Sequence, residues 1–451
     1  MTRRRGRHLR VAAVLIGLTL LAAACGSDSK KAAGTASSSG AAAAPKGTPG
    51  ALAGMKGTTP LVDLPADFKA KLDAQGLDLK TVYNYGAESY DIVNIVALAV
   101  DLANTDGIDY AKQINGVTRG GTKCTSFKAC DALIKAGTKD IDYDGASGPL
   151  EFSGNGEPTV ASYGIQQFVA TDKIDDTKTT FKTAKAPASA DVAEVPVEGT
   201  RAGDGTLKLG TLLPETGSLA FLGPPERAGV RLALKEINDA GGVLGKPIEL
   251  SEGDSGDTST DIASKTVDRE LGEGVDTIIG AASSGVTLTV IDKIVNAGVV
   301  MFSPANTSKK LSSYPDKGLY FRDAPSDILQ GQVLADTIAA DGVNNLAIIN
   351  RNDAYGTGLT EDLTTAFTGS GGKVVATITY DQNAQTFDAE VSKLKDAGAD
   401  GIMIVGFAES ARILALMVQK GIGPSSVKVY GCDGNMGNTL GTDFEAGTIS
   451  K

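Results

Sequence analysis

LKLGTLLPETGSLAFLGPPERAGVRLALKEINDAGG, residues 207–242, joins a short apolar run to an amphipathic segment. The apolar run 207–213 predicts a buried strand, and Pro224-Pro225 is typical of the start of a helix. Within that helix the apolar residues recur at helical spacing, as Val230, Ala233, Leu234 and Ile237. Gly241-Gly242 ends the helix. An apolar strand that leads into an amphipathic helix predicts a parallel sheet covered by helices on both faces.

The same alternation continues to the end of the chain in two runs. The first run continues with strand Ile248–Glu252, helix Ile262–Leu271, strand Thr277–Gly280, helix Thr287–Ala297 and strand Val299–Ser303. The second contains helices Ile328–Ala340, Leu359–Phe367, Phe387–Ala397 and Ala411–Lys420, and strands Leu346–Asn350, Val374–Tyr380, Gly401–Val405 and Val427–Gly431. Two such runs predict two Rossmann-like α/β lobes with parallel-rich sheets, whose cores are residues 207–325 and 326–451.

Residues 57–170 show a different pattern. Predicted helices lie at Ala66–Gln75, Tyr90–Ala103 and Phe127–Ala136, and a predicted hairpin pairs Pro149–Phe152 with Ala161–Phe168 around the turn Gly154-Asn155-Gly156. This segment has too few strands to build a sheet alone, so we expect it to be part of a larger fold. Residues 171–206, rich in Lys, Ala, Asp and Thr, are predicted to be a linker.

The N-terminus predicts export. Five arginines precede an apolar run at 11–24 that is short for a membrane span, so residues 1–24 are interpreted as a signal peptide. Small residues then precede Cys25, a pattern that resembles the lipobox of bacterial lipoproteins and predicts lipidation of Cys25. The alternative is an ordinary signal with an incidental cysteine. Residues 25–56, rich in Ala, Gly and Ser, predict a flexible tether to the outer face of the cell membrane.

Composition narrows the possible functions. The formal net charge is −11, and removal of the signal arginines makes it more negative, so we expect no nucleic-acid partner. The single histidine, His8, lies in the signal, which removes imidazole metal sites and histidine-dependent triads. Cys124 and Cys130 predict a disulfide in an oxidising compartment, with two free thiols as the alternative. Cys432 is interpreted as a small buried residue.

Several runs of residues 205–451 resemble the first two-thirds of the branched-chain amino-acid-binding family, the type I periplasmic binding proteins of ABC importers. These runs are LGTLLPETGSLA at 209–220, AGVRLALKEINDAGG at 228–242, FSPANT at 302–307 and DAYGTG at 353–358. Residues 57–169 resemble the last third of the same family, through ESYDIV at 88–93 and DGASGPLEF at 144–152. The resemblance implies two lobes joined by a hinge, with a small polar ligand bound between them.

The order of the two blocks is exchanged relative to that family, as in a circular permutation. The 36 residues 171–206 would join the old C-terminus to the old N-terminus, and they could span about 100 Å. Domain swapping between two chains and a truncated tandem gene are the alternatives. If the blocks fold together, the C-terminus should lie near residues 52–58. Residues 60–115 should then pack on the lobe containing Leu207–Ser303, and strand Ala161–Phe168 should join the other lobe.

Two loops of the first lobe are candidate ligand contacts. Residues 281–285, AASSG, follow a strand and open a helix, where free N–H groups and hydroxyls favour an anion. The resemblance implies that Ser284 binds a carboxylate; its alternative role is a helix cap. The resemblance also implies that Ala305, through its backbone, and Thr307 hold the head of an amino acid. The alternative is an ordinary loop with Thr307 as an N-cap. Both loops follow neighbouring strands of the predicted sheet. Open α/β sheets bind ligands at the carboxyl ends of such strands.

The second lobe and the first block supply the remaining candidates. The resemblance implies that Tyr355 closes over the ligand, that Phe407 walls the pocket and that Asp433 binds an ammonium group. Asp433 is otherwise a turn or cap residue. Tyr85 is a candidate pocket residue, with core packing as the alternative. One departure is Leu222, which stands where a ligand-contacting tyrosine is common in the family.

Taken together, these features predict a lipid-anchored, extracytoplasmic substrate-binding protein that delivers an amino acid or similar small polar solute to an ABC permease and its ATPase. We expect no cofactor, no metal and no enzymatic activity, since neither a Gly-x-Gly-x-x-Gly run after a strand nor a phosphate loop is present. A hydrolase that uses only carboxylates is the enzymatic alternative. A sensing or structural lipoprotein of the same fold is the non-transport alternative.

Overall fold

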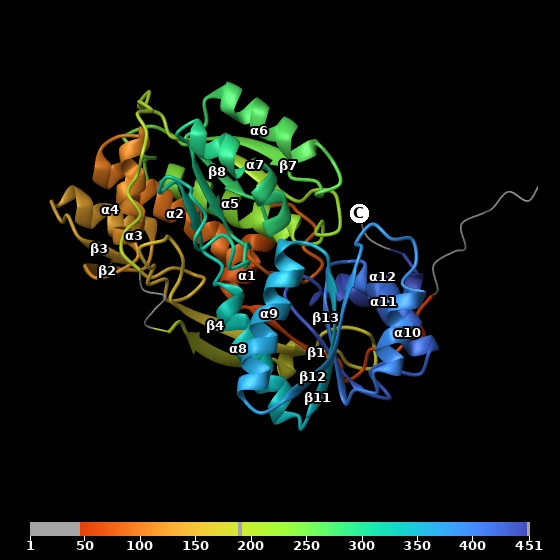
Figure 1. Cartoon of the computed structure of the whole chain (residues 1–451). Coiled ribbons are helices and arrows are strands. Elements are labelled where there is room, and N and C mark those ends of the chain that lie inside the picture. Colours follow the sequence, from red (N-terminus) through yellow and green to blue (C-terminus); the bar gives the residue numbers. More distant parts are fainter. Residues whose placement is uncertain (1–45, 188–191, 449–451) are drawn as a thin grey trace, which may run out of the picture. The chain divides into compact units, whose positions relative to one another are not determined.

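The computed structural model describes residues 46–187 and 192–448 (Figure 1). The predicted signal peptide and Cys25 lie outside the described residues. The alternation of strands and helices that the sequence predicts from residue 207 onward is confirmed. It builds two α/β lobes, each around its own sheet. Among the described residues, no helix has both the length and the apolarity needed to cross a membrane.

The first lobe contains a five-stranded sheet in the order β10-β9-β8-β6-β7, in which every neighbouring pair is parallel. Its strands are β6 (Lys208–Leu213), β7 (Glu249–Asp254), β8 (Thr277–Gly280), β9 (Val300–Ser303) and β10 (Tyr320–Arg322). The connecting helices are α5 (Gly223–Asp239), α6 (Ile262–Glu273) and α7 (Ser284–Asn296). Strands β8 and β9 are buried along their whole length, as expected for parallel strands covered on both faces.

The second lobe contains a seven-stranded sheet in the order β12-β11-β13-β14-β1-β4-β5. Its strands are β1 (Lys56–Pro60), β4 (Val160–Gln167), β5 (Thr180–Lys185), β11 (Asn345–Arg351), β12 (Lys373–Tyr380), β13 (Gly401–Val405) and β14 (Lys428–Gly431). Its helices are α8 (Asp327–Ala340), α9 (Ala354–Gly369), α10 (Asp388–Asp396), α11 (Ser410–Gln419) and α12 (Asn438–Ala446). The first five strands in that order run parallel, and β4 and β5 run antiparallel to their neighbours.

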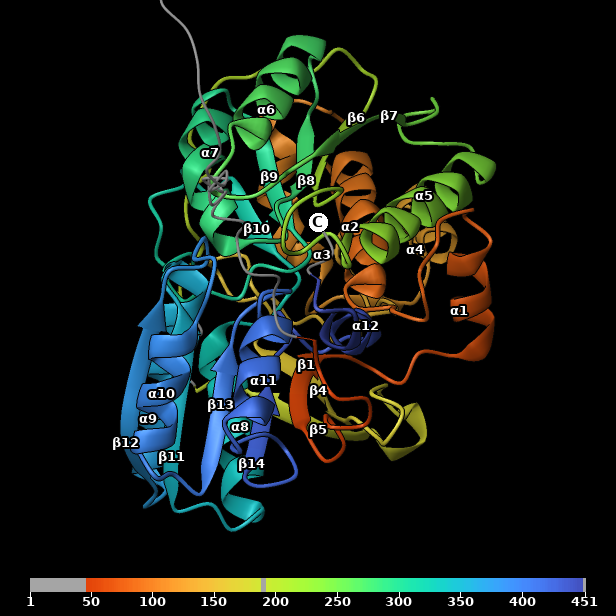
Figure 2. The ribbon, with the colours of Figure 1, turned by 90° about the vertical axis from the view of Figure 1, so that its right-hand side faces the viewer.

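Residues from the start of the chain complete this sheet. Strand β1 pairs parallel with β14, with Lys56 opposite Tyr430, and antiparallel with β4 on its other side. Figure 2 shows β1, β4 and β5 beside β13 and β14, although more than 200 residues of chain separate β5 from β13. Near the end of the described chain, the Gly47 N–H donates to the Phe444 carbonyl at 2.7 Å. Lys451 itself lies outside the described residues. The predicted placement of Ala161–Phe168 in the second lobe is confirmed for Val160–Gln167.

The helices of the first block pack on the first lobe, as predicted. They are α1 (Ala66–Asp73), α2 (Gly86–Ala103), α3 (Ile114–Val117) and α4 (Phe127–Lys135), with a 3₁₀ turn η1 at Ile108–Gln113. Helix α2 lies against α5, where the Tyr90 hydroxyl donates to Glu236 at 2.6 Å. In η1, the Tyr110 hydroxyl donates to the Asp276 carbonyl at 2.8 Å. Residues 86–100 are all buried, so α2 is a core helix shared by the two blocks.

Two predicted boundaries are wrong. The tether was expected to reach residue 56, but Leu52 and Met55 are fully buried, and Asp172 accepts hydrogen bonds from the backbone of Gly50 and Leu52. The apolar side chains in this short segment favour packing over solvation. The expected linker 171–206 contains strand β5, which pairs with β4 at the edge of the sheet. Its polar composition reflects the exposed position of an edge strand.

The predicted hairpin is also wrong in its first strand. Residues 149–152 form no regular strand; a single bridge joins Phe152 to Pro158. Strand β4 uses both edges for other partners, β1 and β5, so no edge remains for Pro149–Phe152. The short elements that sequence periodicity did not indicate include β1, β2 (Thr122–Cys124), β3 (Ile141–Tyr143), β10, η2 (Asp176–Lys178) and α12.

The predicted disulfide between Cys124 and Cys130 is present and links the end of β2 to α4. Cys432 is a free, fully buried cysteine, as interpreted from the sequence.

Close packing between α2 and α5 gives the first testable prediction. A Cβ at Gly229 would stand 2.1 Å from the Gly86 carbonyl oxygen, so Gly229→Ala must push the two helices apart. We expect the free energy of unfolding, measured by urea denaturation, to fall by about 1–3 kcal/mol. Gly272→Ala on α6 is the control, because no atom lies within 4 Å of its Cβ position, and it should raise stability by up to about 1 kcal/mol. Equal stability of the two variants would contradict the observed packing.

Candidate binding site between the lobes

The first-lobe loops lie at the same edge of the sheet because β8 and β9 are parallel neighbours. Side-chain hydrogen bonds join the two loops. The Ser303 hydroxyl donates to the Ala281 carbonyl at 2.7 Å, and the Asn306 amide donates to the carbonyls of Ala281 and Ala282 at 2.8 and 2.9 Å. These bonds hold the backbone around Ala305 and Thr307 next to the start of α7.

Ser284 is the first residue of α7 but is not its cap. Ser283 is the N-cap, and its hydroxyl accepts from the Val286 N–H at 3.4 Å. The Ser284 hydroxyl instead accepts from the Ser308 N–H at 3.3 Å and lies buried between the two loops. A hydroxyl at the N-terminus of a helix suits a carboxylate, because the helix dipole and the first N–H groups favour negative charge.

Ala305 and Thr307 are both buried, but their polar groups differ. The Ala305 N–H donates to the Ser303 hydroxyl at 3.2 Å, so this donor already has a partner within the protein. The Thr307 hydroxyl is buried without a hydrogen bond of ordinary length among the described residues. Thr307 is not an N-cap; Ser326 holds that position before α8, and the Thr307 carbonyl accepts from the Asp327 N–H at 2.8 Å.

In the second lobe, the loops after β11, β13 and β14 meet because these strands are neighbours. They bring Tyr355, Phe407 and Asp433 together. The rings of Tyr355 and Phe407 stack with centroids 5.2 Å apart. The Arg351 guanidinium lies 3.5 Å from the centre of the Phe407 ring and pairs with Glu409 at 2.9 Å. The aromatic wall is therefore fixed by a buried cation that has its own acidic partner.

Asp433 accepts hydrogen bonds from both sides of the interface between the lobes. One carboxylate oxygen accepts from the Tyr355 hydroxyl at 2.8 Å, and the other accepts from the Tyr85 hydroxyl at 2.7 Å. Tyr85 belongs to the first block and packs with the first lobe, whereas Tyr355 belongs to the second. Burial raises the pKa of the Asp433 carboxyl, and the two tyrosine hydroxyls limit the rise. Asp433 is thus a buried acid with hydroxyl partners and no cationic partner among the described residues.

Asp327 is a second acid in this region, and sequence reasoning missed it. Both of its carboxylate oxygens are buried and make no hydrogen bond of ordinary length among the described residues. Burial raises its pKa well above the usual range, and the nearby negative charge of Asp433 adds to the rise. The Thr307 hydroxyl and the charge of Arg322 lower the pKa only in part. Ser326-Asp327 is typical of a helix start, which hid its role in the sequence. Gln330, one turn later, lowers the pKa of Asp433 through a hydrogen bond and was also missed.

Direct contacts between the lobes surround these residues. The Ser308 hydroxyl donates to the Ala354 carbonyl at 2.9 Å, and Lys309 pairs with Asp362 at 2.9 Å. On the other side, the Asn84 amide donates to the Met436 carbonyl at 3.2 Å. The seven candidate residues, which are all buried, are Tyr85, Ser284, Ala305, Thr307, Tyr355, Phe407 and Asp433. Leu222 belongs to the same buried cluster as Tyr85, Tyr355 and Phe407.

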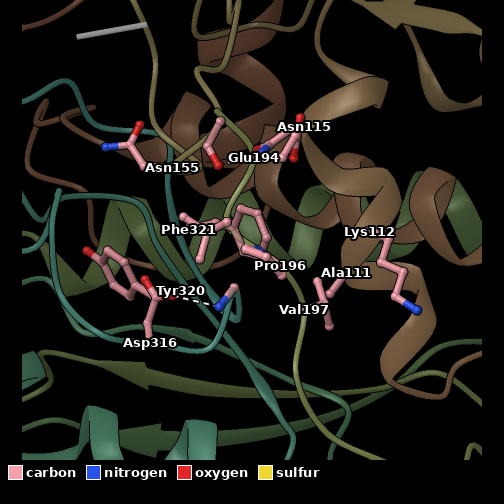
Figure 3. A pocket seen from close by; sticks show the side chains of 13 residues that line it. Ala111, Lys112, Asn115, Asn155, Glu194, Pro196, Val197, Asp316, Tyr320 and Phe321 are labelled. Atoms are coloured by element: carbon pink, nitrogen blue, oxygen red, sulfur yellow. Dashed lines mark hydrogen bonds between the residues drawn. The ribbon is translucent and has the colours of Figure 1, made fainter. Parts of the chain in front are cut away.

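A cavity of about 350 Å³ lies elsewhere, between the first block and the first lobe (Figure 3). Its wall includes Asn115, Glu194, Tyr320 and Phe321, and none of the seven candidate residues lines it. The Tyr320 hydroxyl donates to Asn306 at 3.0 Å, so one wall of this cavity contacts the loop that contains Ala305 and Thr307. The cavity is therefore a neighbour of the candidate site and not part of it.

Comparison with known proteins identifies the family. The family model described as periplasmic binding protein matches residues 206–447, which is more than half of the chain, so the chain belongs to this family. This is a family of binding proteins and not of enzymes, and its name implies an extracytoplasmic location.

Curated relatives agree with this assignment. The chain is 28% identical to Leu/Ile/Val-binding protein homolog 3 of Brucella melitensis over 46% of the chain and 56% of that protein. It is 27% identical to the Leu/Ile/Val-binding protein BraC3 of Rhizobium johnstonii, over 60% of the chain and 72% of that protein. A leucine-, isoleucine-, valine-, threonine- and alanine-binding protein of Pseudomonas aeruginosa is 28% identical, over 54% of the chain and 69% of that protein. The matched region thus spans little more than half of the first of these relatives.

Solved structures of similar proteins align over about half of the chain. The isoleucine complex of the branched-chain amino acid transporter substrate-binding protein LivJ from Streptococcus pneumoniae is 28% identical, covering 51% of the chain and 64% of that protein, with a TM-score of 0.45. The leucine-binding protein LivK from Thermotoga maritima is 23% identical, covering 54% of the chain and 67% of that protein, with a TM-score of 0.49.

The unpartnered carboxylate of Asp327 gives the second prediction. Because its pKa is raised in the folded protein, ionisation of Asp327 opposes folding. That cost is absent below the ordinary pKa of an aspartate and grows as the pH rises through the folded pKa. Asp327→Asn should therefore raise the free energy of unfolding of the ligand-free protein by about 1–3 kcal/mol near neutral pH, and by less near pH 4.5.

Chemical denaturation at the two pH values checks this. Asp336→Asn on the same helix is the control, since Asp336 is a partly exposed partner of Lys182, and its change should stay within about 0.5 kcal/mol. A loss of stability in Asp327→Asn near neutral pH would show that the carboxylate has a stabilising partner.

Proposed function

We propose that this protein is an extracytoplasmic, lipid-anchored substrate-binding protein that captures a free amino acid between its lobes and delivers it to an ABC importer. The observation that carries the proposal is the buried pair of acids, Asp327 and Asp433, set beside the serine-rich N-terminus of α7. Ionised acids are costly to bury without a cation, so the pair favours a ligand with an ammonium group. The helix N-terminus favours a carboxylate on the same ligand.

Each residue then has a role in binding. Asp433 and Asp327 would accept hydrogen bonds from the ammonium group, and Ser284 with the first turn of α7 would hold the carboxylate. The Thr307 hydroxyl, which is buried without an ordinary partner, would bind the same polar head. Tyr355 and Phe407 would cover one face of the ligand. Tyr85 would reach Asp433 only when the lobes are together, because it enters from the first-lobe side.

Ligand binding would therefore favour the arrangement in which the lobes meet. A ligand shifts a conformational equilibrium by its difference in affinity for the two states. An amino acid held by Ser284 in the first lobe and Asp433 in the second gains contacts only when both lobes reach it. The Lys309–Asp362 pair and the Ser308–Ala354 hydrogen bond lie at the same interface and would form together with the ligand contacts.

We also propose that the chain contains one complete family domain with its two blocks in exchanged order. Support comes from the pairing of β1 with β14 within one chain and from the family match, which begins at residue 206. Residues 192–206, which connect the blocks, run along the first lobe. There the Ile108 N–H donates to the Arg201 carbonyl at 3.0 Å, and Arg201 pairs with Asp276 at 2.5 Å.

The third prediction tests amino-acid binding. In a thermal-shift screen of free amino acids and small carboxylates, a true ligand at 100 times its dissociation constant should add about 2.7 kcal/mol of stability. Asp433→Asn should then weaken that ligand by about 1.5–3 kcal/mol in calorimetry, because a charged hydrogen-bond acceptor is lost. Asp396→Asn, on the exposed end of α10, is the control and should bind normally. If no amino acid stabilises the protein, the proposed function is wrong.

The fourth prediction concerns the anchor. Cys25→Ser should move the protein from the membrane fraction to the soluble fraction, because the acyl chains would no longer be attached. Cys432→Ser is the matched control, since Cys432 is buried in the second lobe and its replacement should leave the protein in the membrane fraction. Western blots of fractionated cells report both outcomes. A Cys25→Ser protein that stays in the membrane fraction would refute lipid anchoring at this residue.

A further inference from the structure

Two glutamates meet at the N-termini of the helices that join the first block to the first lobe. Glu88 lies in the first turn of α2 and Glu226 in the first turn of α5. The two helices touch at Gly86 and Gly229, which brings their first turns together. Glu226 is fully buried and Glu88 is 7% exposed. Each glutamate therefore stands in a position from which water is largely excluded.

No cation of the described residues pairs with either glutamate. Both carboxylate oxygens of Glu226 are buried and without a hydrogen-bond partner. Arg227, next in the chain, pairs with Glu215 at 2.8 Å, and its charge offsets the raised pKa of Glu226 only in part. Burial raises the pKa of Glu88 to about 8 and the pKa of Glu226 well above its usual range, with the charge of Glu88 adding to the second rise. Burying such a pair is costly unless a cation joins it.

The pair also adjoins the candidate binding site. Tyr85 immediately precedes α2 and donates its hydroxyl to Asp433, and the charge of Glu88 helps to raise the pKa of Tyr85. Leu222 immediately precedes α5 and packs in one buried cluster with Tyr85, Tyr355 and Phe407. Each glutamate thus lies in the first turn of a helix whose N-cap residue, Tyr85 or Leu222, belongs to that cluster.

A third acid extends this region. Asp323 precedes the crossing into the second lobe, and one of its carboxylate oxygens is buried without a partner. The charges of Asp91 and Glu88 both help to raise its pKa, although burial is the larger cause. Asp91 is different, because the Tyr143 hydroxyl and the backbone N–H groups of Ala146 and Ser147 satisfy it. Near the N-terminus of α2, Glu226 and Asp323 are therefore acids with unpartnered carboxylate oxygens, whereas Asp91 is satisfied.

We propose that Glu88 and Glu226 form a second acidic subsite that receives a cationic group on the side chain of the ligand, so that the preferred amino acid is a basic one of the lysine or ornithine type. The inference rests on the proposed function, because the amino-acid head must be held by Asp433 and Ser284. A side-chain ammonium would supply a directly paired cation, which neither glutamate has among the described residues. Leu222 and Tyr85 would contact the aliphatic part of such a side chain.

Calorimetric titration with L-lysine and L-norleucine tests the subsite, since norleucine has the same chain length without the terminal ammonium. In the unmodified protein at about pH 7.5, lysine should bind roughly 10-fold to 100-fold more tightly, the range for a hydrogen bond to a charged group. Glu226→Gln and, separately, Glu88→Gln should each remove most of this preference while leaving norleucine affinity within about threefold.

Glu270→Gln is the control variant. Glu270 is also a buried acid with an unpartnered oxygen and a pKa raised to about 8, but it lies on α6 against Gly210. It should keep the full preference for lysine. If neither glutamine variant folds, the lysine-to-norleucine ratio of the unmodified protein decides the question.

The outcomes separate the two proposals. Equal or tighter binding of norleucine by the unmodified protein would overturn the acidic subsite and leave amino-acid binding intact. An unchanged lysine preference in both glutamine variants would also overturn it. Binding of neither compound, together with no response in the amino-acid screen, would overturn the proposed function and the subsite with it.

Discussion

Strand β1 is the element on which the second lobe and the binding site depend. It lies between β14 and β4, so its backbone N–H and C=O groups join a parallel sheet to an antiparallel extension. Without β1, β14 would be an exposed edge and β4 would have no sheet to join. The same block then carries Tyr85 to Asp433. One strand from the start of the chain therefore completes the sheet of one lobe, and the helix that follows packs on the other.

The chemistry of the site follows from where acids are buried. Asp327 and Asp433 come from the second lobe, and Glu88 and Glu226 from helices packed on the first. Each has a raised pKa because burial disfavours its charged form, and none forms an ion pair among the described residues. The charges of Arg322 near Asp327 and Arg227 near Glu226 offset the rise only in part. Arg351, by contrast, is buried with Glu409 and Asp353 as ion-pair partners and lies over the Phe407 ring. A site with excess buried acid is matched to a ligand that brings positive charge, and the ligand's binding energy offsets the cost of burial.

Sequence patterns predicted the loops of the site better than the roles of individual residues. Thr307 and Asp433 come from loops that follow parallel strands, and Ser284 and Tyr355 from the first turns of the helices after such strands. The sheet order brings these strand ends together. The patterns did not separate Ser283, the true helix cap, from Ser284. They also missed Asp327, because an acid at a helix start is ordinary in a sequence and becomes unusual only when it is found buried without a partner.

The amino-acid sequence by itself determined the alternation of apolar strands and amphipathic helices from residue 207 onward, because periodicity is a local property. It also determined the disulfide, through the short spacing of Cys124 and Cys130. Only the tertiary structure decided that β5 and residues 46–55 belong to the folded domain and that Pro149–Phe152 is not a strand. The outcomes for β5 and Pro149–Phe152 depend on which edges of β1 and β4 are occupied, and that for residues 46–55 depends on the burial of Leu52 and Met55. The meeting of Glu88 with Glu226 is of the same kind, since it follows from contacts between segments far apart in the chain.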